Sequence, residues 1–106
     1  MNLGILYEKG NGVIQDYSES VRWYKLASAT GNPLAQYNLG VMYYRGHGIL
    51  QNYLLAHMWF NISAVKGNLD AVKNRDITAE KMTPQQIAEA QKLARECQSR
   101  NFKNCD

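Results

Sequence analysis

The sequence is poor in the features that mark metal sites, membrane spans and nucleic-acid-binding surfaces. It has two histidines and two cysteines, and neither histidine has a cysteine or an acidic residue beside it at metal-ligand spacing. No apolar run approaches the roughly 20 residues of a membrane-spanning helix. The net charge is only +3, and the basic residues form no run of the kind that binds nucleic acid. We therefore expect no metal, no cofactor, no membrane insertion and no nucleic-acid partner.

The order of the glycines reveals an internal repeat. LGILYEKGNGVIQDY (3–17) aligns with LGVMYYRGHGILQNY (39–53), and SVRWYKLASATGN (20–32) aligns with AHMWFNISAVKGN (56–68), both at an offset of 36 residues. All eight glycines pair at this offset, as do the two tryptophans: Gly4 with Gly40, Gly10 with Gly46, Gly12 with Gly48, Gly31 with Gly67, and Trp23 with Trp59. Chance does not align eight glycines. We therefore divide a single domain, 1–106, into a truncated first repeat at 1–32, a second repeat at 33–68 and a divergent unit at 69–106.

Each repeat has the pattern of two helices joined by a turn. Ala35, Leu39 and Tyr43 recur every four residues, so they share one face of a first helix. A glycine-rich turn at 46–48 follows, and a second apolar set around Trp59 predicts the second helix. A 36-residue period of this kind predicts an all-α fold, a right-handed α–α superhelix, or solenoid, of helix–turn–helix repeats.

Glycine, asparagine and proline mark where these helices begin and where they touch. Asn32 and Asn68 stand where they can cap a following helix, and Pro33 stands where the first helical turn tolerates proline. Gly4 and Gly40 fall in the middle of a predicted helix, where glycine costs about 1 kcal/mol relative to alanine. Because this cost recurs at one repeat position, we expect a close helix–helix approach there.

Residues 69–106 depart from the repeat and predict a helical cap. Thr83, Pro84 and Gln86 form a capping-box pattern with proline at the first helical position. An apolar stripe then predicts a helix over 84–100: Ile87, Ala90, Leu93, Ala94 and Cys97. A last unit with a polar outer face is what the end of a solenoid requires.

The repeated residues resemble the Sel-one-like repeat family, which is related to the tetratricopeptide repeats. The family's pattern of alanine, Leu-Gly, tyrosine, Gly-x-Gly and Trp-(Tyr/Phe) appears in AQYNLGVMYYRGHGILQNYLLAHMWFNISAVKG (35–67) and in LGILYEKGNGVIQDYSESVRWYKLASATG (3–31). The resemblance covers 1–72 closely. It implies an α-solenoid that acts as an adaptor, binding another protein or a peptide of unknown identity, without catalysis.

In such solenoids the first helix of each unit lines a concave groove. With Leu39 and Tyr43 in the core, helical phase selects the side chains that face this groove: Ile5, Lys9, Tyr37, Asn38, Val41, Tyr44, Arg45, Lys73 and Asn74. We expect Tyr37 and Tyr44 to anchor a ligand, because tyrosine is enriched in binding hot spots. Arg45 suits an extended peptide with an acidic group or a C-terminal carboxylate, since arginine pairs with carboxylates in a bidentate fashion. The alternative is a solvated face with ordinary surface side chains.

The first repeat lacks the start of its first helix, because Met1 aligns with Tyr37. A second hypothesis, the alternative to an adaptor, is therefore that the chain is the tail of a longer exported array, in which this piece mainly caps the stack. The apolar face left open around Leu3, Leu6 and Tyr7 offers a surface for self-association.

Enzymatic activity is a third hypothesis. Ser63 and Lys66 form an S-x-x-K sequence, the nucleophile motif of penicillin-binding enzymes. The S-D-N and K-T-G elements that those enzymes also need are absent, and Ser63 aligns with Ala27, a small packing position. We expect Ser63 to pack and not to catalyse, and His47 and His57 to be turn or surface histidines.

Cys97 and Cys105 leave two interpretations open. If the helix continued, eight residues would separate their Cα atoms by about 12 Å, which is too far for a disulfide. The polar segment between them can instead end the helix and turn back. The spacing is similar to the tails of exported bacterial members of the family, which favours a disulfide and a periplasmic or secreted protein. Two unpaired thiols in a cytoplasmic protein are the alternative, and residues 1–12 show no signal peptide.

Overall fold

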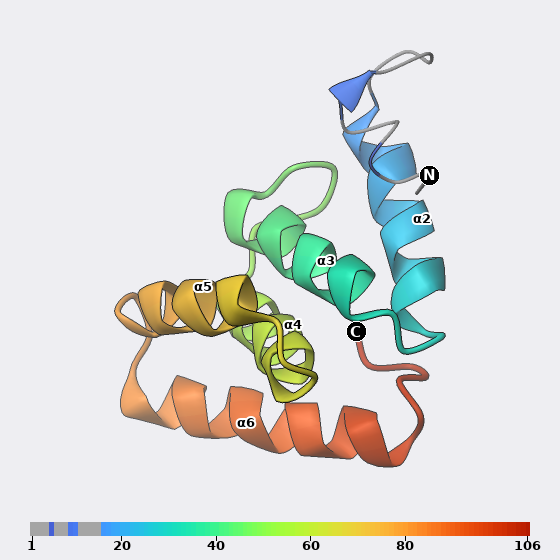
Figure 1. Ribbon diagram of the computed structural model, residues 1–106. Coiled ribbons are helices and arrows are strands. Elements are labelled where there is room, and N and C mark those ends of the chain that lie inside the picture. Colours follow the sequence, from blue (N-terminus) through green and yellow to red (C-terminus); the bar gives the residue numbers. More distant parts are fainter. Residues whose placement is uncertain (1–4, 6–8, 11–15) are drawn as a thin grey trace.

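The computed structural model describes residues 5, 9, 10 and 16–106. Five helices have described bounds, and no strand occurs in this part of the chain: α2 (Tyr17–Ser28), α3 (Pro33–Arg45), α4 (Tyr53–Val65), α5 (Leu69–Ala79) and α6 (Pro84–Ser99). Figure 1 shows α2 at one end of the molecule and α6 at the other, with α3, α4 and α5 between them. The predicted all-α solenoid is therefore confirmed.

The helices begin at the residues that the sequence marks. Asn32 accepts hydrogen bonds from two amides of the first turn of α3, at 3.0 and 3.1 Å, and Pro33 is the first residue of that helix. Asn68 caps α5 through a 3.2 Å hydrogen bond. Thr83 and Gln86 form a complete capping box at the start of α6. These predicted caps are confirmed, and each one stabilises its helix by about 1 kcal/mol.

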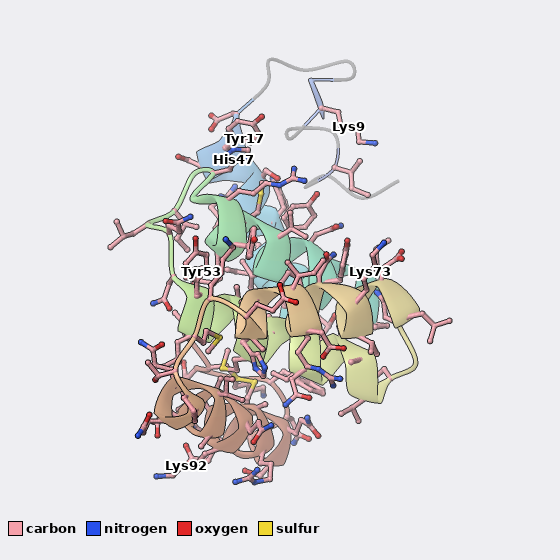
Figure 2. The ribbon with its side chains drawn as sticks, turned by 90° about the vertical axis from the view of Figure 1, so that its left-hand side faces the viewer. Lys9, Tyr17, His47, Tyr53, Lys73 and Lys92 are labelled. Carbon is pink, nitrogen blue, oxygen red and sulfur yellow. A yellow bond between two sulfur atoms is a disulfide. The ribbon has the colours of Figure 1, made fainter. Side chains whose placement is uncertain are left out.

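The turn between α3 and α4 packs back on the start of α2. Gly46 ends α3 with a φ of 70°, and its amide donates to Met42 at 2.8 Å. A Cβ atom on Gly48 would lie 2.4 Å from the backbone of Tyr17, so only glycine fits there. The imidazole of His47 stacks on the Tyr17 ring with centroids 4.5 Å apart, and Figure 2 labels this pair.

The glycines in turns share a left-handed backbone conformation, which glycine adopts more readily than other residues. All five that are described in turns have a positive φ: Gly10, Gly31, Gly46, Gly48 and Gly67. Gly4 and Gly12 lie outside the described residues, as do Leu3, Leu6 and Tyr7 of the predicted self-association surface.

α4 is the central helix, because it packs against α3, α5 and α6. More than half of its side chains are buried: Ala56, His57, Met58, Trp59, Phe60, Ile62 and Ser63. The repeat counterpart of Trp59, Trp23 on α2, is only half-buried and lies under the guanidinium of Arg22, 5.1 Å from the ring centroid. The core is therefore concentrated around the second helix of the second repeat.

The close approach expected at Gly40 lies between α3 and α4. A Cβ atom added to Gly40 would come within 2.7 Å of the Phe60 ring and 3.3 Å of the Ala56 carbonyl oxygen. The missing side chain therefore lets the Phe60 ring lie directly against the α3 backbone.

The chain turns back after α6 and returns to the junction of α2 and α3, where Figure 1 marks the C end. Cys97 and Cys105 form the predicted disulfide, with their Cα atoms 5.2 Å apart. The hydroxyl of Tyr43 donates a 2.6 Å hydrogen bond to the Asp106 carboxylate, and the Lys25 ammonium lies 3.7 Å from the same oxygen. We call residues 100–106 the C-terminal strap.

An aromatic contact fixes the middle of the strap. The ammonium of Lys66 lies 4.1 Å from the Phe102 ring centroid and donates to the carbonyl oxygen of Gly31. The strap therefore joins α6 to the ends of α2 and α4 and to the side of α3.

Candidate binding groove

A pocket of about 350 Å³ lies between α3 and α5. Its described lining comes from three helices: Tyr37, Asn38, Val41, Tyr44 and Arg45 from α3, Phe60 from α4, and Asn74 and Ile77 from α5. Figure 2 faces the side of the molecule where α3 lies above α5. The volume is at the lower end of the range of about 300–1,000 Å³ that is usual for ligand pockets. We call this site the groove.

Tyr37 forms one wall of the groove and is held on two sides. Its hydroxyl oxygen accepts a 2.7 Å hydrogen bond from the side-chain amide of Asn74, and its ring lies 5.7 Å from that of Phe60. Burial raises the pKa of Tyr37, and the Asp70 carboxylate raises it further, while the Asn74 hydrogen bond and the Arg45 charge lower it. Tyr37 is therefore a neutral, fixed part of the wall.

Tyr44 and Arg45 form the end of the groove at the last turn of α3. The Tyr44 ring packs on Tyr53 with centroids 5.4 Å apart, and the Tyr44 carbonyl oxygen accepts a 2.9 Å hydrogen bond from Gln51. Arg45 is exposed, and no described residue forms a hydrogen bond or an ion pair with its guanidinium. The tyrosine is thus positioned by the protein, while the arginine can bind something else.

Six of the nine residues predicted to face the groove line this pocket: Tyr37, Asn38, Val41, Tyr44, Arg45 and Asn74. Lys73 is the neighbour of Asn74 on α5; it is exposed and does not line the pocket. Ile5 packs against the core, and Lys9 is exposed at the far end of the molecule, so the structure does not bring either one to the pocket.

The apolar set around Trp59 places Phe60 in the core, and the structure confirms this, because Phe60 is only 1% exposed. Sequence reasoning did not predict that the buried ring also lies against the groove. The available signal was Gly40. A helix that lacks a Cβ atom at its contact point leaves space, and the Phe60 ring on the partner helix extends through it towards the groove.

The expectation of a turn or surface position is wrong for His57, which is only 2% exposed. It lies on the face of α4 that α5 covers, near Arg75 and Asp76. Burial lowers its pKa, the Arg75 charge lowers it further, and the Asp76 charge opposes both. Within the described chain, no group forms a hydrogen bond with its Nδ1 atom. His57 is therefore a neutral core residue.

Ser63 and Lys66 do not form a nucleophile–base pair. Ser63 is fully buried, and its hydroxyl donates a 2.7 Å hydrogen bond to the carbonyl oxygen of Pro33. The Lys66 ammonium instead donates to Gly31 and contacts the ring of Phe102. Ser63 thus joins α4 to the first residue of α3, and Lys66 joins it to the preceding turn, which gives the S-x-x-K sequence a packing role.

The described residues contain no cluster of three or more histidine, cysteine, aspartate or glutamate side chains that could hold a metal ion. None of the helices in the described part is both long enough and apolar enough to cross a lipid bilayer.

The chain is similar to known repeat proteins. The family model described as Sel1 repeat matches residues 1–32 and 33–68. A solved structure of a protective antigen present in uropathogenic Escherichia coli strains, displaying an SLR fold, superposes with a TM-score of 0.91 at 31% identity over 98% of this chain. A Sel1 repeat protein from Oxalobacter formigenes superposes with a TM-score of 0.68 at 34% identity over 69% of it.

The match covers only part of each of these two proteins. This chain spans 22% of the length of the Escherichia coli protein and 30% of the Oxalobacter formigenes protein. Among curated proteins, no sequence matches it.

Proposed function

This chain belongs to the Sel1 repeat family, and from that premise we propose that it binds an extended segment of another protein in the groove between α3 and α5. Proteins of this family generally mediate protein–protein interactions, and solenoids bind their partners on extended concave surfaces.

The observation that carries this proposal is the chemistry of the groove lining. Tyr37, Tyr44, Val41 and Phe60 provide an aromatic and aliphatic surface that is already held in place by neighbouring side chains. In contrast, the side-chain amide of Asn38 has no hydrogen-bond partner among the described residues. An apolar surface with a few open polar groups is typical of a binding site, and tyrosine is enriched where binding energy is concentrated.

The direct test is whether a peptide captured by the protein lies in the groove. The immobilised protein is incubated with a pool of random hexapeptides that are acetylated and amidated at their ends, and the retained peptides are quantified by mass spectrometry. Asn38→Trp places a large ring across the groove. We expect this variant to retain at least tenfold less peptide than the unmodified protein.

Gln91→Trp is the matched control, because it adds the same ring to an exposed position of α6. We expect it to retain the same peptides as the unmodified protein, and circular dichroism verifies that both variants are folded. Equal retention by all three proteins would contradict binding in the groove, as would retention by none.

We also propose that the protein acts in an oxidising compartment, the periplasm or the cell exterior. The Cys97–Cys105 disulfide supports this, because such bonds persist where thiols are not kept reduced. Protein purified from its native host under denaturing, alkylating conditions should carry no alkyl group until it is reduced. Two alkyl groups without reduction would place it in the cytoplasm.

A second role, capping the end of a longer array, is favoured by α6. Its outer face is exposed and polar, while Ala90, Ala94 and Cys97 are buried beneath it. A capping unit is required to shield the last apolar face of a solenoid. The two roles are compatible, because the groove and α6 use different surfaces.

A further inference from the structure

Two charges of opposite sign flank the groove. Arg45 is the last residue of α3, eight residues after Tyr37 and therefore near the same helix face. Asp70 lies in the first turn of α5, four residues before Asn74, and so shares the face that contacts Tyr37. Arg45 therefore lines one end of the groove, and Asp70, which is not itself a lining residue, lies one helical turn beyond Asn74 at the opposite end.

Neither charge is neutralised within the described chain. No hydrogen bond or ion pair there involves the Arg45 guanidinium or the Asp70 carboxylate, and both residues are exposed. Four other acidic residues of the described chain do form ion pairs: Glu19, Asp76, Glu96 and Asp106. Both ends of the groove are therefore open to a charged ligand.

The electrostatic fields of both charges act on Tyr37 in the groove wall. After burial, the largest influence that raises the pKa of Tyr37 is the Asp70 carboxylate, and the Arg45 guanidinium acts in the opposite direction. A ligand that lies along Tyr37 therefore experiences the charges of both ends, in addition to the neutral lining between them.

The separation of the two charges sets the length of the ligand. Asn74 lies beside Tyr37, Asp70 precedes Asn74 by one turn and Arg45 follows Tyr37 by two turns, so the Cα atoms of Asp70 and Arg45 are about 18 Å apart along the helices. An extended chain spans that distance in roughly five or six residues.

We propose that the groove selects an extended segment that carries a cationic and a carboxylate side chain about five residues apart, the cation at Asp70 and the carboxylate at Arg45. This inference rests on the proposed function, because it specifies the chemistry of a ligand bound in that groove. A like-charged segment would gain one ion pair and suffer one repulsion.

Four capped hexapeptide pools test the inference: Lys-X4-Glu, Lys-X4-Lys, Glu-X4-Glu and Gln-X4-Gln, where X is an equal mixture of neutral residues. The immobilised protein is offered all four together at low salt, because salt screens such pairs. We expect the Lys-X4-Glu pool to be enriched about tenfold over each like-charged pool, a difference of about 1.4 kcal/mol in binding free energy.

Charge reversal at one end should change the preference in a predictable direction. Arg45→Glu gives the groove two acidic ends and should favour Lys-X4-Lys, while Asp70→Lys gives it two basic ends and should favour Glu-X4-Glu. Lys92→Glu and Glu89→Lys make the same changes in net charge, but on α6. Figure 2 labels Lys92 on this helix, away from α3. These two control variants should keep the preference for Lys-X4-Glu.

The outcomes separate this inference from the proposed function. If all four pools bind equally and Asn38→Trp abolishes binding of all four, the groove binds peptides and the charge selection is wrong. If the α6 controls change the preference as much as the groove variants, net charge governs binding and the inference is overturned. Failure of all pools to bind overturns both proposals.

Discussion

Gly40 sets the distance between α3 and α4, because the Phe60 ring occupies the space that a side chain would need. We predict that Gly40→Ala lowers the free energy of unfolding by about 1–3 kcal/mol through overpacking, although alanine is the better helix former by about 1 kcal/mol. Urea denaturation measures the change. The double variant Gly40→Ala with Phe60→Leu should recover part of the loss, and an unchanged single variant would contradict the close contact.

The buried imidazole of His57 makes stability depend on pH. Its pKa in the folded protein is lowered below the ordinary value of 6.5, chiefly by burial. At pH values between the folded and the unfolded pKa of His57, the unfolded chain binds more protons than the folded chain. The contribution of His57 to the free energy of unfolding is therefore complete above pH 6.5 and is lost as the pH falls towards the folded pKa. We predict a falling melting temperature from pH 7 to pH 5 and a shallower fall in His57→Gln.

His47→Gln provides the control, since His47 lies in the α3–α4 turn and stacks on Tyr17. It should keep the slope of the unmodified protein. Equal slopes in all three proteins would show that His57 does not control acid stability.

For single residues, helical phase predicted most of the groove lining but did not predict which polar side chains are buried. Tyr37, Val41 and Arg45 followed from a four-residue spacing that depends only on α-helix geometry. The position of His57 depends on what packs over α4, and spacing within one helix does not determine that. The available signal was its repeat counterpart Val21, an apolar residue that is also buried.

Among the elements, the C-terminal strap is the one that the disulfide controls. We predict that Cys97→Ser with Cys105→Ser lowers the free energy of unfolding by about 2–3 kcal/mol, the entropy of closing so short a loop. Part of the loss should come from freeing Asp106 from Tyr43 and Lys25. The melting temperature of this double variant should equal that of the unmodified protein measured with a reductant. A melting temperature unchanged by either treatment would contradict this role.

α6 depends on the small buried residues that lie against α4. We predict that Ala94→Asp, which places a carboxylate at a position that is 1% exposed, destabilises the protein by about 3 kcal/mol or more. Ala88→Asp is the control, because Ala88 is exposed on the same helix. Urea denaturation should show a large loss only for Ala94→Asp, and similar losses in both would mean that α6 does not pack as described.

Element boundaries were largely predictable, since caps are local. Asn32, Thr83 and Gln86 act within one turn of their own helix. The path of the strap was not predictable beyond the disulfide, because the Tyr43–Asp106 hydrogen bond joins residues 63 positions apart. No pattern in the tail indicates that a carboxylate will reach a tyrosine of the second repeat.

The whole molecule departs from a simple stack through this same strap. In a solenoid each repeat contacts only its neighbours, so units can unfold separately. Here the strap ties α6 to α2 and α3, which are not adjacent to it in the stack. We predict that the oxidised protein unfolds in one transition when followed both by tryptophan fluorescence and by circular dichroism.

After reduction the two signals should separate. Trp23 lies in α2 and Trp59 lies in α4, and α6 has no tryptophan. Tryptophan fluorescence therefore does not report directly on α6, whereas circular dichroism reports on every helix. We expect circular dichroism to change at a lower temperature than fluorescence in the reduced protein. Coincident curves in both states would mean that α6 unfolds together with the repeats without help from the strap.

The disulfide also determines how the chain would respond to a mechanical load. A force applied at Asp106 passes through the sulfur–sulfur bond directly into Cys97, so the intervening residues bear no tension. The eight-residue separation corresponds to about 28 Å of hidden contour length. A reductant would release that length, and the same pull would then detach Phe102 from Lys66 before it reached α6.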